Sequence, residues 1–261
     1  MRKWTCYPTV CPLLIKASIG VVAICCGIAA SAGNIETAHS TAYFSEHGRE
    51  HGKASWFPDT PAVPHFSWRP RPCPSCTALP PAATWSKMAS LAGISKVRFL
   101  RTADERNGIA YSVAPATIVL SPAALNLSRC ALSFVIGHEL THLALRHYDQ
   151  DVVTLAFLAH QPVIAGANGD DVIQLLDSDF SLALKMSPYW EAEEHEADWA
   201  GSLLAAQACG CTIEKGAMAF LHSHTDEAGG GIAAAHETDQ TRIRELQPFI
   251  RSAHILADGA H

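Results

Sequence analysis

Two histidines and a glutamate in the middle of the chain have the spacing of a metal site. They are His138, Glu139 and His142, in the run Gly-His-Glu-Leu-Thr-His that begins at residue 137. Residues four apart lie on one face of an α-helix, so the two histidines can direct their imidazoles at a single metal ion. Glu139 lies beside the first ligand, where its carboxylate can deprotonate a water bound to the metal. The pattern predicts hydrolytic metal chemistry with Glu139 as the base.

The residues around this pattern predict the helix that it needs. Ser128 is placed to cap the start of that helix. The apolar residues that recur at helical spacing are Leu132, Val135, Ile136, Leu140 and Leu143. They give the segment a face that a core would bury. The alternative is a helix whose histidines are merely packed or exposed, but a chain of this composition matches the pattern by chance only about 0.04 times.

A catalytic zinc usually has three protein ligands, so two histidines leave the site incomplete. The metzincin pattern would need a glycine at 145 and a histidine at 148, but the chain has Leu145 and Tyr148 there. The alternative is a carboxylate from a later helix. Glu194 and Asp198 are four residues apart, so Glu194 could ligate the metal while Asp198 accepts a hydrogen bond from a ligand histidine and fixes its tautomer.

Residues close to these candidates have simpler interpretations. Glu191, Glu193 and Glu196 belong to the same acidic run as Glu194, and a solvated helix face would explain them. His147 is expected to make a structural hydrogen bond, with a supporting role near the metal site as the alternative.

The segment before the metal motif predicts one helix and a small sheet. The helix spans Ala83–Leu91 and ends at Gly93. Three short runs rich in β-branched or aromatic residues predict an antiparallel sheet. These runs are Val97–Leu100, Ile109–Val113 and Thr117–Leu120. The last run could be an edge strand that docks an extended substrate or an interior strand, and the sequence favours neither. Ser121 and Pro122 then predict the start of a short helix.

Two further helical segments are expected after the motif. Asp151–Gly166 is apolar but too short to span a membrane, so it is expected to pack on the core or line a substrate cleft. Asp170–Ser187 is expected to form a helix and loop that Pro188 closes.

The N-terminal third of the chain differs in composition from the rest. Arg2 and Lys3 precede an uncharged apolar run, Ala17–Ala32, which ends in Ala-Ser-Ala. Residues 1–32 are therefore expected to be a cleaved signal peptide, or else a signal anchor that contacts the membrane, and the protein to be exported to the periplasm or cell envelope. Residues 33–81 contain many prolines and are expected to be an arm or linker. Residues 82–261 then form one domain with its own core.

The charge of the chain argues against nucleic acid as a partner. The net charge is −6, from 19 basic and 25 acidic residues. Cleavage after residue 32 would remove three basic residues and no acid, so the mature chain would carry 16 − 25 = −9. An acidic surface repels polyanions.

Five cysteines follow the expected leader, and an odd number leaves at least one thiol unpaired within the chain. They are Cys73, Cys76, Cys130, Cys209 and Cys211. Cys73-Pro-Ser-Cys76 favours a local structural disulfide, because the surrounding prolines do not suit a thioredoxin motif and no second Cys-x-x-Cys completes a zinc ribbon.

Beyond these local patterns, the chain resembles the zinc metallopeptidase family that includes HtpX, the Oma-type mitochondrial protease, the CAAX prenyl protease and the exported BepA-type proteases. The motifs that carry the resemblance are Gly137–His142 and Glu194-x-x-Ala-Asp198. Residues 107–110 and 118–120 resemble the family's strands before the first zinc helix. Residues 236–246, which contain His236 and Arg242, resemble its closing His-Pro-x-x-x-x-Arg-Ile motif, with Glu237 in place of the proline.

The resemblance implies an α+β, mainly helical gluzincin domain with a small antiparallel sheet before the first zinc helix. It implies one zinc ion per chain, held by His138, His142 and Glu194, with Glu139 as the catalytic residue. Asp198 and Arg242 would support the site, and His236 would gate the metal or contact substrate. The substrates would be peptide bonds of exported or envelope proteins. The alternatives are a chaperone-like envelope assembly factor on the same fold and, last, a thiol-disulfide protein built on Cys73 and Cys76. The sequence leaves the oligomeric state open.

Overall fold

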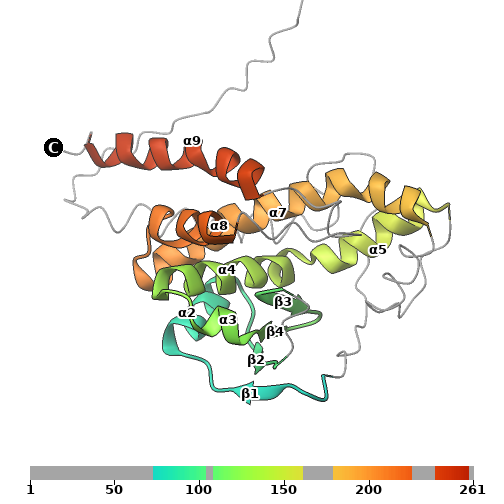
Figure 1. Cartoon of the computed structure of the whole chain (residues 1–261), viewed down its shortest axis with the longest axis horizontal. Helices are drawn as coiled ribbons and strands as arrows, with labels where there is room; N and C mark the ends of the chain where they lie inside the picture. The colour runs from blue at the N-terminus through green and yellow to red at the C-terminus, as the bar shows by residue number, and fades with distance from the viewer. Residues whose placement is uncertain (1–72, 104–107, 161–178, 225–238, 259–261) are drawn as a thin grey trace, which may run out of the picture. The chain divides into compact units, whose positions relative to one another are not determined.

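The computed structural model describes residues 73–103, 108–160, 179–224 and 239–258. The expected leader, 1–32, lies outside them, as does most of the expected arm. The described part is mainly helical with one four-stranded sheet (Figure 1). Its elements are β1 (Thr77–Leu79), α2 (Ala83–Leu91), β2 (Arg98–Arg101), β3 (Ala110–Val113), β4 (Thr117–Leu120), α3 (Pro122–Leu125), α4 (Arg129–Leu145), α5 (His147–Leu158), α7 (Phe180–Cys209), the π-helix η1 (Glu214–Met218), α8 (Ala219–His224) and α9 (Asp239–Asp258).

The sheet has the strand order β1-β2-β4-β3 and is mixed. β1 pairs antiparallel with β2, and β3 pairs antiparallel with β4, whereas β2 and β4 are parallel. The expected antiparallel sheet is therefore wrong for the central pair. After β2 the chain crosses to the far edge of the sheet and forms β3. It then turns back as β4, which lies between β2 and β3 and runs parallel to β2. β1, from the segment expected to be an arm, forms the other edge.

β4 is an interior strand, which decides between the two interpretations of Thr117–Leu120. All four of its residues are buried. A continuous run of apolar and β-branched residues suits a strand that is covered on both faces. β3 is instead an edge strand within the described residues, and it is the strand that reaches the metal site.

Serine caps start the two helices that follow the sheet, as expected. Ser121 Oγ accepts a hydrogen bond of 3.2 Å from Ala124 N, and Ser128 Oγ accepts one of 3.3 Å from Ala131 N. α4 ends at Arg146, whose left-handed backbone (φ 60°) separates it from α5. A left-handed residue that is not glycine is costly. The guanidinium of Arg146 binds Asp149, with Nε 2.6 Å from Oδ2, and this ion pair helps to hold the turn.

Pro188 does not end a helix as expected, because α7 continues through it. A proline inside a helix removes the hydrogen bond to the carbonyl four residues earlier, here that of Leu184. Leu184 and Pro188 are both exposed, so water can bind this carbonyl. The missing bond therefore costs less than it would in the core. The helix expected at Asp151–Gly166 begins earlier, at His147, and residues 161–178 lie outside the described ranges.

α4 lies at the centre of the described fold and is covered on two sides. Ile136 and Leu140 pack in a core with residues of the sheet, α2 and α7. Phe134 and Val135 pack in a second core with residues of η1, α8 and α9. Figure 1 shows α4 between the sheet and α7. Burial on both sides fixes the rotation of α4 about its axis, and with it the direction of its histidines. No helix in the described ranges is long and apolar enough to cross a membrane.

Candidate metal centre

Two glycines let α4 and α7 touch backbone to backbone. A Cβ atom built on Gly137 would lie 2.5 Å from the carbonyl oxygen of Gly201, which no real side chain tolerates. The helices are antiparallel, because Cys130 at the start of α4 is bonded to Cys211 just after α7, whereas Gly137, further along α4, contacts Gly201, further back along α7. Glu194 lies two helical turns before Gly201. The close crossing therefore brings Glu194 alongside the histidines that follow Gly137.

The three expected ligand atoms form a compact triangle. His138 Nε2 lies 3.1 Å from His142 Nε2. Glu194 presents Oε2 at 3.4 Å from His138 Nε2 and Oε1 at 3.5 Å from His142 Nε2. A tetrahedral zinc with bonds of about 2.05 Å separates neighbouring ligand atoms by about 3.4 Å. The two nitrogens and the carboxylate therefore fit one metal ion of this size without rearrangement.

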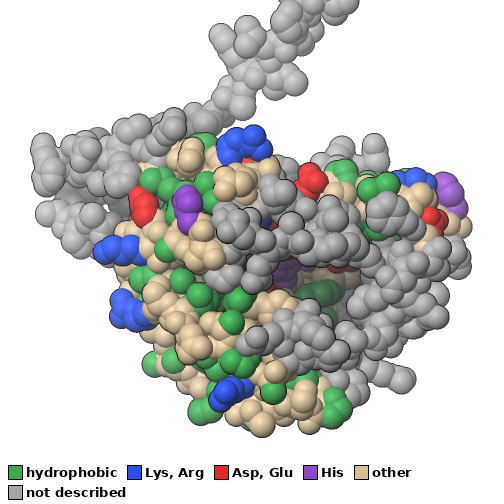
Figure 2. Space-filling model, viewed as in Figure 1, with side chains coloured by type: hydrophobic (Ala, Val, Ile, Leu, Met, Phe, Trp, Pro, Cys, Tyr) green, Lys and Arg blue, Asp and Glu red, His purple; other side chains and the backbone are tan. Residues whose placement is uncertain are grey.

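The ligand side chains are mostly covered but remain accessible from one side. Exposure is 11% for His138, 12% for His142 and 21% for Glu194. Figure 2 shows histidine and acidic side chains at the bottom of a hollow on one face of the molecule. Partial exposure of this kind is what a catalytic metal needs, because one coordination position has to remain open to water and substrate.

The outer nitrogen of His138 is fixed by a buried carboxylate. Its Nδ1 lies 2.9 Å from Asp198 Oδ1, as expected for a ligand whose Nε2 faces the metal. Arg242 binds the same carboxylate twice, through Nε at 2.8 Å and Nη2 at 2.5 Å. Its Nη1 lies 3.4 Å from Glu194 Oε2. Arg242 therefore connects a ligand carboxylate with the carboxylate that orients a ligand histidine.

Charge compensation keeps both carboxylates ionised. Burial raises the pKa of Glu194, but His138 and Arg242 outweigh it and hold that pKa well below its usual value. Burial likewise raises the pKa of Asp198, but Arg242 and His138 lower it by more. The pKa of Asp198 therefore lies below its usual value. Burial lowers the pKa of His138, whereas the two carboxylates raise it to about 10. The metal-free site is thus built to hold positive charge, which a divalent cation would supply.

His142 has its own orienting chain, through His147, for which the sequence predicted a structural hydrogen bond, and Glu196, whose role the sequence did not predict. Its Nδ1 lies 2.9 Å from His147 Nδ1, and His147 Nε2 lies 3.4 Å from Glu196 Oε2. Burial lowers the pKa of His147 to about 4, so this ring is neutral. A neutral His147 with its proton on Nε2 can donate to Glu196 and accept from His142. That arrangement leaves His142 Nε2 free of a proton and able to bind a metal.

The expected base, Glu139, is fixed by β3. Ser112 Oγ donates a 2.7 Å hydrogen bond to Glu139 Oε2. Tyr148 OH lies 2.9 Å from the same hydroxyl and donates a 2.7 Å hydrogen bond to the Ser112 carbonyl oxygen. Burial raises the pKa of Tyr148, and the nearby charge of Glu139 raises it further, so Tyr148 remains a donor. Ser112 and Tyr148 together hold the Glu139 carboxylate in one orientation.

The structure brings together six of the seven expected site residues, namely His138, Glu139, His142, Glu194, Asp198 and Arg242. His236 lies outside the described residues. Sequence reasoning missed Ser112, Tyr148 and Glu196 as neighbours of the site. For Glu196 a weak signal existed, because a buried acid needs a partner and His147 was available. Nothing local marked Ser112, which reaches Glu139 only through the packing of β3 on α4.

Comparison with known families agrees with this geometry. The family model described as Peptidase family M48 matches residues 82–250, more than half of the chain and all of the described metal centre. Comparisons with curated proteins and with solved structures found no match. The disulfide expected between Cys73 and Cys76 is also present. Because the family model covers the elements that carry His138, His142 and Glu194, this chain belongs to peptidase family M48.

Proposed function

We propose that the protein is a zinc-dependent endopeptidase. The observation that carries the proposal is the ligand triangle of two imidazole nitrogens and one carboxylate, with a carboxylate base on the adjacent residue, Glu139. Peptidases of this family are metal-dependent. Nitrogen and oxygen donors at tetrahedral spacing favour zinc over magnesium or calcium, which prefer six or more oxygens. We assign one zinc ion per chain to His138, His142 and Glu194.

In the proposed reaction one side chain, Glu139, transfers a proton, and the other side chains of the site hold the ligands and Glu139 in position. A bound zinc ion would supply Lewis-acid polarisation of the scissile carbonyl and acidify a water. Glu139 accepts the proton of the attacking water and later donates it to the leaving amine. Because Ser112 occupies Oε2, we assign this transfer to Oε1 of Glu139. Asp198 and His147 keep the ligand imidazoles in the required tautomer.

Arg242 acts in this proposal as a positioning residue. Its contacts with Asp198 and Glu194 already occupy three of its nitrogens. It therefore fixes the ligand geometry and neutralises the two acids. Of the two donors that the sequence offers for the developing oxyanion, His236 and Arg242, we therefore propose His236.

We assign substrate docking to β3, one of the two edge strands of the described sheet. Extended peptides commonly add to such an edge through main-chain hydrogen bonds. β3 carries Ser112, which contacts the base, so a peptide paired with this strand would lie close to Glu139. The substrates in this proposal are unfolded or extended segments of exported or envelope proteins. Two features support that location, the apolar N-terminal segment and the two disulfides, which persist in oxidising compartments.

Metal content and cleavage, measured together, test the proposal. The full chain, purified without added metal, should contain about one zinc by elemental analysis and should cleave an unfolded protein such as reduced casein. Glu194→Gln should lose most of the metal, whereas Glu139→Gln should keep it and lose cleavage. Glu245→Gln is the matched control, because Glu245 is exposed on α9, and it should change neither quantity.

Two outcomes would contradict the proposal. A folded wild-type protein without zinc would reject the metal assignment. The second outcome is a zinc-loaded wild type that does not cleave an unfolded protein but protects it from aggregation. If Glu139→Gln gives the same protection, the result would favour the client-binding alternative.

A further inference from the structure

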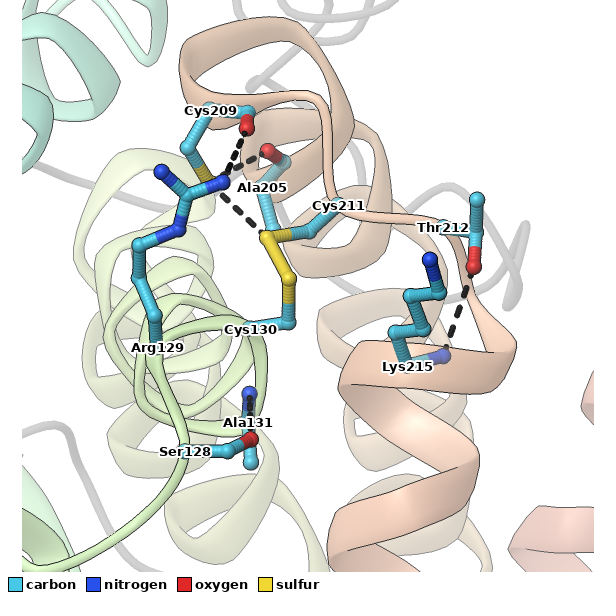
Figure 3. The surroundings of a disulfide bond; sticks show 9 residues. All are labelled: Ser128, Arg129, Cys130, Ala131, Ala205, Cys209, Cys211, Thr212 and Lys215. Atoms are coloured by element: carbon cyan, nitrogen blue, oxygen red, sulfur yellow. Dashed lines mark hydrogen bonds between the residues drawn. A yellow bond between two sulfur atoms is a disulfide. The ribbon is translucent and has the colours of Figure 1, made fainter.

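A cysteine that forms no disulfide lies beside a disulfide at the end of α7. Cys130 and Cys211 form a disulfide, whereas Cys209 carries a free thiol. The sulfur of Cys209 lies only 3.2 Å from that of Cys211. Figure 3 shows the sulfur of Cys211 between those of Cys209 and Cys130. Three sulfur atoms in this order have the arrangement that thiol-disulfide exchange requires, with a nucleophile, a central sulfur and a leaving group.

The surroundings of Cys130, the leaving sulfur, favour the exchange, whereas the Cys209 thiol first has to give up a 2.9 Å hydrogen bond to the Ala205 carbonyl oxygen. Cys130 is the second residue of α4, after the cap Ser128. A thiolate released there is stabilised by the helix N-terminus. Arg129 adds a positive charge to the same region, and its Nη2 donates a 3.1 Å hydrogen bond to the carbonyl oxygen of Cys209 (Figure 3).

Of the three cysteines, the central one, Cys211, is the buried one. Cys211 is 1% exposed, whereas Cys130 and Cys209 are partly exposed. A thiol in solution therefore has little access to Cys211, but Cys209 is already in contact with it. Gly210 separates the two cysteines and has a left-handed backbone (φ 65°), which glycine adopts without strain. The short Cys-Gly-Cys segment can therefore keep its turn while the bond moves.

We propose that Cys130, Cys209 and Cys211 form an internal thiol-disulfide exchange site. The Cys209 thiol gives its proton to solvent, and the thiolate attacks Cys211 Sγ. The Cys209–Cys211 bond forms as the Cys130–Cys211 bond breaks. Cys130 leaves as a thiolate and takes up a proton from solvent. One disulfide and one thiol are present before and after, so the step needs no oxidant or reductant.

The exchange changes how the two ligand-bearing helices are connected. The Cys130–Cys211 bond ties the start of α4, which carries His138 and His142, to the segment just after α7, which carries Glu194. After exchange both bonded sulfurs belong to the α7 end, and α4 has no covalent connection to it there. The helices then depend on packing alone, including the Gly137–Gly201 contact. The exchange thus determines whether the N-terminus of α4 is covalently attached to the segment after α7.

Trypsin makes the two disulfide states easy to distinguish. Cleavage after Arg129, Arg146, Lys185 and Lys215 places Cys130 in the fragment 130–146, and Cys209 with Cys211 in the fragment 186–215. The full chain, purified without reductant, is incubated at pH 8, quenched with acid, and alkylated with N-ethylmaleimide before digestion. The original state gives the two fragments joined, with Cys209 alkylated. The exchanged state gives fragment 130–146 alkylated and fragment 186–215 with an internal disulfide.

The proposal predicts that alkylated fragment 130–146 accumulates with time in the wild type, at least about fivefold above its level in Cys209→Ser. The rate should not change on tenfold dilution of the protein, because the reaction is intramolecular. Absence of the exchanged fragments after a day, or equal alkylation of Cys130 in Cys209→Ser, would overturn the proposal. A rate proportional to protein concentration would also overturn it, since that result indicates exchange between chains. None of these readouts depends on zinc or on peptidase activity.

Discussion

The backbone of Gly201 lies directly against the amide of His138, the first of the three residues to which we assign the metal. A Cβ atom at position 201 would be 2.5 Å from His138 N and 2.8 Å from its Cα. The separation of α4 and α7, and with it the size of the ligand triangle, is therefore set by the absence of a side chain here. Gly137 makes the reciprocal contact with Gly201 O.

Gly201→Ala should force the two helices apart and impair the site. Overpacking of this kind costs about 1–3 kcal/mol of unfolding free energy, which exceeds the gain in helix propensity of about 1 kcal/mol from replacing glycine. We expect a lower urea midpoint and a zinc content well below one per chain. Gly216→Ala is the matched control, because a Cβ there meets its nearest atom, Cys130 O, at 3.3 Å and also faces α4. Equal zinc content in the two variants would contradict this account of the helix crossing.

Arg242→Lys should weaken zinc binding although it preserves the charge. A lysine ammonium cannot reproduce the two parallel contacts that Arg242 makes with Asp198 while also reaching Glu194. Loss of an orienting partner typically lowers metal affinity about ten- to a hundredfold. Competition with a zinc chelator measures the dissociation constant. Arg244→Lys, on the exposed side of α9, should bind zinc like the wild type. Unchanged affinity in Arg242→Lys would mean that charge alone, and not the paired contacts, supports the site.

Ser112→Ala should reduce catalysis without removing the metal. The hydroxyl of Ser112 donates to the base Glu139, and a hydrogen bond to a charged group is worth about 1.5–3 kcal/mol. We therefore expect kcat/KM for a peptide substrate to fall about ten- to a hundredfold, with zinc still near one per chain. Tyr148→Phe should have a smaller effect, since the hydrogen bonds between Tyr148 and Ser112 act on Glu139 indirectly, through the position of Ser112.

Ser112→Thr separates this role from simple packing. Threonine keeps the hydroxyl and suits a strand, so it should recover most of the activity that alanine loses. If the threonine and alanine variants lose activity equally, the effect comes from the buried space around Ser112 and not from its hydrogen bond to Glu139.

The parts of the site that the sequence could predict are those that depend on one helix at a time. His138 and His142, like Glu194 and Asp198, are pairs four residues apart, and helical geometry alone places each pair on one face. The contacts of Ser112 with Glu139 and of His147 with Glu196 join different elements. They depend on how β3, α5 and α7 pack on α4, which no local spacing encodes.

The difference between local patterns and packing between elements also explains where the predicted fold was wrong. The β-branched and aromatic residues of Val97–Leu100 and Thr117–Leu120 indicate strands, but they do not encode strand direction, so the parallel pairing of β2 with β4 could not be predicted. Pro188 is a strong local signal to end a helix. It was overridden because Met186 and Trp190, on either side of it, are buried against α5 in a common core. Tertiary packing continues the helix through a residue that disfavours it.

The two disulfides should differ in their contribution to stability. Cys130–Cys211 closes a loop with a sequence separation of 81, whereas Cys73–Cys76 closes one of 3. Loop-closure entropy in the unfolded chain then predicts losses of about 4.5 kcal/mol and about 2 kcal/mol when each bond is removed. The double variant Cys130→Ala, Cys211→Ala should accordingly lose more than twice the unfolding free energy of Cys73→Ala, Cys76→Ala, as measured by urea titration of both proteins.

Removing Cys211 also leaves Cys209 without its neighbouring sulfur, so this variant cannot form the alternative bond. The single variant Cys130→Ala can form it, because Cys209 and Cys211 remain in contact. A Cys209–Cys211 bond closes a very short loop, so by the same loop-closure argument it should restore only about 1.5 kcal/mol. Cys130→Ala should therefore unfold at a urea concentration between those of the double variant and the wild type, and closer to that of the double variant. A stability close to that of the wild type in either variant would show that packing between α4 and α7, and not the covalent tie, holds the two metal-binding helices together.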